Sequence, residues 1–386
     1  MLALRLTRGT HPVVLLRRLA VSAAAAGTGF LLLSTMGHAL GHPGAGRAGM
    51  LRLLWCLPPL AATVQLAVAV ARTDPGTRVQ RGLSAVGFGP HRMMLLAAVN
   101  TLMSCALGSM LALAFFLHLR GDLTGLPMDG EAAALLGAGR SLPFAAALTL
   151  LALTPLTAAA ACALALRPRR PHPGELLAPA RPEPPAPAPT GLPWGMALIA
   201  AGLTVELIAA GRDGMGMPLP GHLAATPAGV LAGWAVTALG LALAGPGLTH
   251  LCGRLLQSRS PDAVRLLAGR VLQEEAARIG RPLGVVCAVV SAAVAALFLY
   301  TGPARSFGPL TALGGSLVAA CTLLALLTAA VEARQARAHT RTVLLRLGAP
   351  RTVLRSAVAL RTAVLLALFT PLTCVIALLA AAPLRN

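Results

Sequence analysis

Nine stretches of apolar residues constrain this chain more than any other feature, because each is long enough to cross a lipid bilayer as a helix. About 20 helical residues span the roughly 30 Å hydrocarbon layer. The nine stretches are Leu19–Leu40, Leu51–Ala71, Met93–Leu119, Leu142–Leu166, Leu192–Ala210, Ala228–Leu251, Leu283–Tyr300, Pro309–Val331 and Ala357–Ala382. Charged residues make up 11% of the 386 residues, whereas soluble domains contain about 25%. The sequence therefore predicts an all-α, polytopic membrane protein with about nine transmembrane helices.

The distribution of arginines indicates how the chain crosses the membrane. With a cytosolic N-terminus, 24 of the 32 arginines lie in inward segments and 7 in outward ones, while Arg361 lies early in the last stretch. Positive residues concentrate on the cytosolic side of membrane proteins. We therefore expect a multi-pass protein of the plasma (inner) membrane with its N-terminus in the cytosol. The first stretch is longer than the apolar core of a signal peptide and lacks a clear cleavage site, so we interpret it as a signal anchor.

The net charge of +20 is consistent with this orientation and with contact to anionic lipids in the bilayer. A nucleic-acid surface would carry aromatic residues among its basic ones, and aromatic residues are only 3% of this chain. We therefore expect no nucleic-acid partner. The chain also contains no lysine, which excludes a Walker A motif, a Schiff-base lysine and an S-x-x-K nucleophile.

Few residues suggest metal or catalytic chemistry. His38 and His42 are spaced as two ligands on one helix face, but no third ligand accompanies them, so we predict no metal site. The seven cysteines lie in or beside apolar stretches without a C-x-x-C pair, which favours helix packing. Glu206 is the one acidic residue inside a stretch and is a functional candidate by default. It lies near the expected outer end beside Arg212 and Asp213, so reaching the surface is an equally good interpretation.

Two glycine patterns have structural rather than catalytic meaning. Gly191 and Gly195, and likewise Gly229 and Gly233, form small-x-x-x-small motifs that allow membrane helices to approach closely. The letters G-x-G-x-x-G also occur at residues 44–49, in a short loop without the flanking strand and helix that a nucleotide site needs. We therefore predict tight helix pairs and no nucleotide site in this chain.

An internal repeat links two of the inward segments. Residues 78–92 and 339–353 both run from arginines through an apolar stretch to a glycine, then to a second basic cluster and a membrane stretch. The residues that pair in this alignment are Leu83 with Leu344, Val86 with Leu347, and Gly87 with Gly348. Each segment reads as a short amphipathic helix that stops at glycine before the chain re-enters the membrane. Two ordinary basic loops would be the simpler interpretation, but the matched order favours a shared role.

These segments resemble the cytosolic loop of the FtsX/MacB-type ABC transporter permeases, whose pattern is R-x-x-L-x-x-L-G-A before a hydrophobic helix. The match is good from Arg341 to Val353 and weaker from Arg81 to Met93, where Val-Gly-Phe replaces Leu-Gly-Ala. The segments 2–8 and 263–270 also resemble the amphipathic prelude of the family. The resemblance implies a first half at 1–167 with four spans, a Pro-rich cytosolic linker at 168–190, two connecting spans at 191–252, and a second half at 253–386 with three spans.

The resemblance further implies that a separate ABC-type ATPase docks on the two inward loops. Carried onto this sequence, the docking residues are Arg81, Leu83, Val86, Gly87, Phe88 and Arg92 in the first loop, and Arg341, Leu344, Leu345, Arg346, Leu347, Gly348, Ala349, Pro350 and Arg351 in the second. ATP and magnesium would bind the partner, so this chain would have no cofactor, no catalytic residue and no metal. Because one chain carries two loops, we expect two ATPase copies per chain.

The sequence departs from the family in three ways. The acidic residue often found about thirteen positions after the motif glycine is replaced by Asn100 and Arg361. No outward loop is long enough for an extracellular domain, which needs about 40 residues, and the second half stops after its third span. The alternatives are an ATP-independent membrane scaffold or sensor and, less favoured, an intramembrane lipid-modifying enzyme. An enzyme needs converging acids or histidines, and the outward acids show no recognisable motif.

Overall fold

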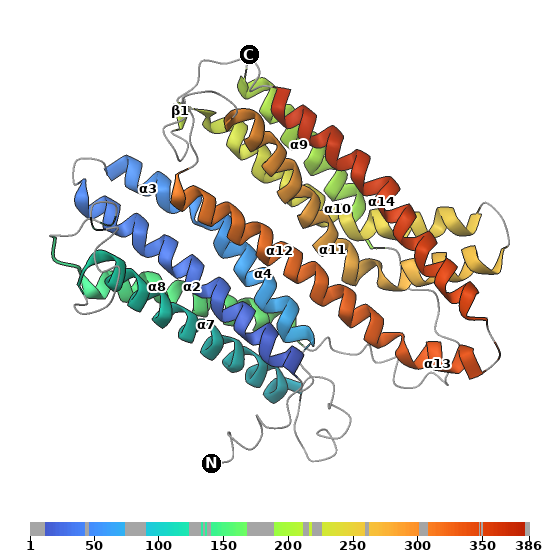
Figure 1. The fold of residues 1–386 in the computed structure, drawn as a ribbon. Helices are drawn as coiled ribbons and strands as arrows, with labels where there is room; N and C mark the ends of the chain where they lie inside the picture. Colours follow the sequence, from blue (N-terminus) through green and yellow to red (C-terminus); the bar gives the residue numbers. More distant parts are fainter. Residues whose placement is uncertain are drawn as a thin grey trace, which may run out of the picture. The chain divides into compact units, whose positions relative to one another are not determined.

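The chain is an all-α polytopic membrane protein, shown as a computed structural model in Figure 1. The structure describes residues 12–42, 46–73, 90–122, 133, 136, 140–167, 189–210, 216–217, 226–258, 262–300, 308–346, 348 and 350–382. Within these ranges, nine helical segments are long and apolar enough to cross a membrane. The helices are α2 (Pro12–Gly41), α3 (Gly46–Trp55), α4 (Leu57–Thr73), α7 (Pro90–Arg120), α8 (Phe144–Ala165), α9 (Gly191–Ala210), α10 (Ala228–Ser258), α11 (Ala263–Tyr300), α12 (Pro309–Ala336), α13 (Ala338–Arg346) and α14 (Arg351–Ala381).

The predicted spans are confirmed, and two of them differ in detail from the expectation. The second span is divided at Cys56 into α3 and α4, because Pro58 and Pro59 are two consecutive residues without the amide hydrogens that would continue the helical hydrogen bonds of α3. The seventh span is the apolar part of α11, whose 38 residues extend about 57 Å. Residues 263–270, which resemble the amphipathic prelude of the family, form the start of the same helix. Two-residue strands β1 (Gly216–Met217) and β2 (Thr226–Pro227) pair antiparallel.

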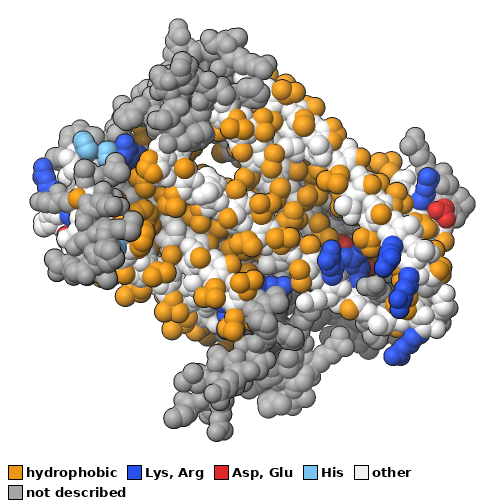
Figure 2. Space-filling model, in the orientation of Figure 1, with side chains coloured by type: hydrophobic (Ala, Val, Ile, Leu, Met, Phe, Trp, Pro, Cys, Tyr) orange, Lys and Arg blue, Asp and Glu red, His pale blue; other side chains and the backbone are white. Residues whose placement is uncertain are grey.

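Large apolar side chains point outward along these helices, as expected for a protein that has lipid as its solvent. Leu16, Leu107 and Trp194 are each about two thirds exposed or more, at 68%, 66% and 73%. Figure 2 shows hydrophobic side chains over most of the described surface on the face in view. In a soluble monomer such a surface would far exceed the usual apolar patch.

The residues gather into two compact units, which we describe separately. The first contains Met1–Arg170 and Gly308–Ala325, and the second contains Pro171–Phe307 and Leu326–Asn386. Helix α12 begins in the first unit and ends in the second.

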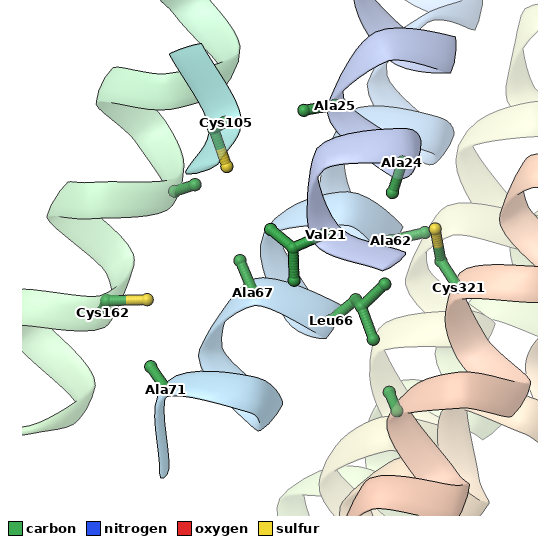
Figure 3. Packing of buried hydrophobic residues seen from close by; sticks show 12 residues of the cluster. Val21, Ala24, Ala25, Ala62, Leu66, Ala67, Ala71, Cys105, Cys162 and Cys321 are labelled. Atoms are coloured by element: carbon green, nitrogen blue, oxygen red, sulfur yellow. The ribbon is translucent and has the colours of Figure 1, made fainter. Parts of the chain in front are cut away.

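In the first unit, α2, α4, α7, α8 and the start of α12 enclose a core of small side chains. Val21 and Leu66 lie near its centre, with Cys105 and Cys162 at its edge (Figure 3). The hydroxyls of Thr28 and Thr63, on α2 and α4, lie 2.8 Å apart and form a buried hydrogen bond. Alanine and cysteine let membrane helices approach closely, and such hydroxyl pairs add polar contacts between them.

In the second unit, α10 packs closely against α9 and α11, and α11 also packs against α14. The glycine motifs explain how α9 and α10 meet: a Cβ on Gly195 would lie 2.5 Å from the backbone nitrogen of Ala244. A Cβ on Gly229 would lie 2.5 Å from the Cβ of Ala209. Both distances are too short for a real contact, so the predicted close packing of this helix pair is confirmed.

Helices α7 and α14 occupy equivalent positions in the alignment of the two predicted repeat segments. The alignment that pairs Gly87 with Gly348 also pairs the first residues of α7 and α14 and their last residues, and both helices have 31 residues. In the first unit, the Ser22 hydroxyl on α2 donates to the carbonyl of Ser104 on α7. In the second, Ser291 on α11 is 3.4 Å from the carbonyl of Thr373 on α14, at the same sequence separation of 82 residues.

Candidate functional site

The second predicted docking loop consists of the end of α12, the short helix α13 and the start of α14. Helix α13 ends at Arg346, and the chain turns at Gly348 before α14 begins at Arg351. The amide of Gly348 donates to the carbonyl of Leu345 at 3.2 Å, which closes the turn. The predicted order of short helix, glycine stop and membrane helix is therefore confirmed for this segment.

Gly348 adopts the left-handed conformation that the sequence analysis associated with a glycine stop. Its φ is +87°, and no heavy atom lies within 4 Å of where its Cβ would be. Glycine is required by the backbone conformation rather than by crowding. Pro350 follows with φ −66° and ψ 139°, an extended conformation that suits proline and leads directly into α14.

The predicted docking residues of this loop differ in the exposure of their side chains, and therefore in whether a partner could contact them. Arg346, Pro350 and Arg351 are exposed, and Leu345 is partly buried. Arg341 and Leu344 belong to α13, with side chains outside the described part, while Leu347 and Ala349 lie outside the described residues. Sequence reasoning did not single out Val343, which is 41% exposed on α13 and adds an apolar contact.

The first docking loop lies almost wholly outside the described residues. Only Arg92 belongs to them, and it is exposed in the first turn of α7. The other predicted residues, all in the undescribed range 74–89, are Arg81, Leu83, Val86, Gly87 and Phe88. Their docking role stays a prediction.

A buried charged cluster connects the second loop to two long helices, and sequence reasoning missed it. Glu275 on α11 is only 7% exposed. Its Oε1 lies 2.7 Å from Nε of Arg337, the residue between α12 and α13, and its Oε2 lies 3.6 Å from a terminal nitrogen of Arg361 on α14. One carboxylate therefore contacts the start of the α13 segment and the last membrane helix. We call Glu275, Arg337 and Arg361 the charged triad.

The triad has a clear structural cause. Arg361 lies eleven residues into α14 and is 9% exposed, so its guanidinium needs a buried partner. Glu275 supplies it from the charged half of α11, while Arg337 also donates from Nε to the carbonyl of Ala333 at 3.0 Å. Two arginines face one carboxylate, which leaves one positive charge in excess. The only sequence signals were a glutamate pair at 274–275 and an arginine inside a membrane stretch.

The arrangement links the α13 segment to two long helices through one carboxylate. A displacement of α13 would act on α11 through Arg337 and Glu275, and on α14 through both the Gly348 turn and Arg361. Among the described residues, no group of three or more histidine, cysteine or acidic side chains could hold a metal. His38 and His42 stack with ring centroids 4.3 Å apart on the end of α2. The seven cysteines are unpaired, and six of them are buried.

Comparison with known proteins adds no further identification. No protein-family model matches the chain, and neither a curated protein nor a solved structure matches it.

Proposed function

We propose that this chain is the transmembrane permease subunit of an ABC-type complex, in which a separate ATPase hydrolyses ATP. The chain would use that energy for export or for transmitting a mechanical signal across the plasma membrane. The observation that carries the proposal is the α13–Gly348–α14 segment, an exposed helix–turn–helix whose sequence has the FtsX/MacB-type pattern. The proposed orientation, with this segment and the N-terminus in the cytosol, rests on the distribution of the arginines.

Three properties support docking of a partner at this segment. Helix α13 has nine residues and exposes Val343 together with Arg346, a combination of apolar contact and charged rim. The Gly348 turn gives a defined direction between α13 and α14, because its amide is hydrogen-bonded and its conformation is left-handed. The charged triad fixes the segment to α11, so that a push on α13 reaches the membrane helices.

In the proposed mechanism, the ATPase grips α13 in a groove and changes its position during the hydrolysis cycle. Arg337 and Glu275 pass the movement to α11, and the turn at Gly348 passes it to α14. By the internal repeat, a second ATPase copy docks on the loop before α7. ATP and magnesium bind only the partner, and this chain contributes no catalytic group.

A co-purification experiment tests the proposal. The tagged chain is isolated from its native membranes with wild-type sequence, with Val343→Asp and with Val343→Thr, and ATPase activity in the eluate is measured. The aspartate places a charge in the proposed contact, where leaving it unpaired costs several kcal/mol, so we expect the ATPase to be lost. Threonine keeps the shape of valine without a charge and should retain it. Equal ATPase recovery with Val343→Asp at matched membrane expression would contradict the proposal.

The ATP-independent scaffold predicts a different result in the same experiment. A scaffold would yield no co-purifying ATPase from the wild-type chain, whatever the state of α13. Mass spectrometry of the wild-type eluate therefore distinguishes the two functions before any variant is made.

A further inference from the structure

Glu206 is buried inside the α9–α10 helix pair. The sequence also allowed its side chain to reach the membrane surface, and in the structure it does not. Its side chain is 1% exposed, and it lies in line with Gly195, Ile199 and Gly202 on the buried stripe of α9. The facing residue is Gly233 of α10, where a Cβ would come within 2.5 Å of Cγ of Glu206. The glycine therefore makes the space that the carboxyl side chain occupies.

The two carboxyl oxygens of Glu206 have different surroundings. Oε1 accepts a hydrogen bond from the Thr237 hydroxyl on α10 at 3.2 Å. Oε2 is buried and has no hydrogen-bond partner among the described residues. Inside this membrane helix pair, one oxygen of the carboxyl group therefore has a hydrogen-bond partner among the described residues and the other has none.

The described surroundings of Glu206 contain no compensating positive charge. On α10, the first ionisable residue after Thr237 is His250, about 20 Å further along the helix at 1.5 Å per residue. On α14, which also packs against α9, Leu372 and Ile376 join the apolar cluster around Ile199. The charged residue of α14 nearest in sequence to that cluster is Arg361, which Glu275 already holds. Arg212 and Asp213 lie outside the described residues.

A lone buried carboxylate is expensive in a membrane, and intramembrane acids mark ion or proton sites. A metal cation would need more ligands than this site offers: hard cations take about six or more oxygens. Glu206 and Thr237 supply three side-chain oxygens, and the described residues contain no metal-binding group of three ionisable side chains. A proton needs only one oxygen, and Oε2 is free to take it.

We propose that Glu206 is a proton-binding site within the α9–α10 pair, and that its acid form is the target of apolar carboxyl-modifying reagents. The site takes up one proton at Oε2 while Thr237 remains hydrogen-bonded to Oε1. Loss of the proton leaves a negative charge between two closely packed helices, so the proton controls how tightly the pair is held. This inference does not depend on the proposed ATPase partner.

The protonated carboxyl group of Glu206 can be detected by its reaction with a carbodiimide, which needs no other reactant. The carboxyl O–H adds across one C=N bond of a dialkylcarbodiimide, forming a C–O bond while the proton moves to nitrogen. The acyl group then migrates from oxygen to nitrogen: the bond between the acyl carbon and that oxygen breaks, an acyl C–N bond forms, and the oxygen stays on the former carbodiimide carbon as the urea carbonyl. The product, an N-acylurea, carries the whole mass of the reagent, and nothing is released or oxidised.

The experiment treats the full chain in liposomes with dicyclohexylcarbodiimide, an apolar reagent, and separately with a water-soluble carbodiimide. Peptide mass spectrometry should find the apolar reagent on Glu206, and labelling should fall about tenfold for each pH unit above the titration midpoint. The water-soluble reagent should instead modify Glu274, whose side chain is 60% exposed. Glu206→Gln keeps the side-chain shape and should remove the label from this peptide.

Two further measurements of carbodiimide labelling test the proton site. Thr237→Val removes the hydrogen bond that favours the ionised form, and it should label at least as fast as the wild type. Adding sodium ions at constant pH should leave labelling unchanged. Absence of label on wild-type Glu206, equal labelling by the water-soluble reagent, or protection by sodium would each overturn the proton site.

Discussion

Replacing Glu275 by glutamine removes the only negative charge of the triad and leaves Arg337 and Arg361 facing each other. With an effective dielectric constant of about 20, the contacts at 2.7 and 3.6 Å correspond to about 6 and about 5 kcal/mol of attraction. Desolvation offsets much of this, and breaking a buried pair typically costs about 3–5 kcal/mol. We expect that loss for Glu275→Gln and for Arg361→Met. Arg337→Met should lose about 1.5–3 kcal/mol, because the Arg337 side chain is 29% exposed.

The buried cysteines provide the assay. Six cysteines are buried and Cys374 is exposed, so a thiol-reactive dye that fluoresces on coupling reports unfolding in a Cys374→Ser background. Heating detergent-purified protein should give the highest midpoint for the wild type, then Arg337→Met, then the variants of Glu275 and Arg361. Each cysteine becomes reactive only when its surrounding helices separate, so the midpoint follows the packing directly.

A double variant separates the charge effect from lost packing. Changing Glu275 and Arg361 together to leucine removes the buried pair and leaves Arg337 able to reach water. Apolar replacement of a buried ion pair is often neutral or stabilising, so this variant should unfold closer to the wild type than either single change. A double variant less stable than both single ones, or Glu275→Gln with the midpoint of the wild type, would refute the account of the triad.

Further predictions follow from other parts of the fold. Gly348→Ala should weaken ATPase co-purification and lower stability by about 1 kcal/mol or more, because alanine resists the left-handed conformation. Gly315→Ala is the matched control: that glycine is helical and also has open space around it, so co-purification should be unchanged. Gly202→Val should separate α9 from α10, since a Cβ there would lie 2.7 Å from the carbonyl oxygen of Gly233; a wild-type midpoint in the dye assay would argue against this. Cysteines placed at Thr190 and Asn386 should label from opposite sides of the membrane, and labelling from one side would contradict nine spans. Native mass spectrometry should find two ATPase chains per permease chain rather than two of each.

The nine membrane-spanning helices of the described residues could be predicted from the sequence, because each span meets the requirements of lipid with its own residues. Each span must satisfy its own backbone hydrogen bonds and present apolar side chains, so its evidence lies within about 20 consecutive residues. The end of the short helix at Gly348 could be predicted for the same reason, because the glycine, Pro350 and the start of α14 are neighbours in the chain. The division of the second span into α3 and α4 also has a local cause, the neighbouring prolines Pro58 and Pro59, although the apolar stretch Leu51–Ala71 is continuous.

The charged triad and the depth of Glu206 could not be predicted, because they depend on contacts between distant residues. Glu275 and Arg361 are separated by 86 positions, and no local pattern marks which arginine a glutamate will meet. The sequence left a buried and a surface-reaching position of Glu206 equally open, and the glycine at 233 on another helix provides the space for burial. The docking of an ATPase was inferred from the short inward motifs alone.

The division of α12 between the compact units has a consequence for biosynthesis. The first unit includes Gly308–Ala325, which follows most of the second unit in chain order. A ribosome adds about 5–20 residues per second, so the first unit waits roughly 8–30 s after Arg170 for its last component. During that interval the residues of α2 and α4 that later pack with Leu317 and Cys321 lack this contact. Nascent chains arrested before α12 should therefore expose an incomplete first unit to the insertion machinery, and expression of residues 1–170 alone reproduces that intermediate.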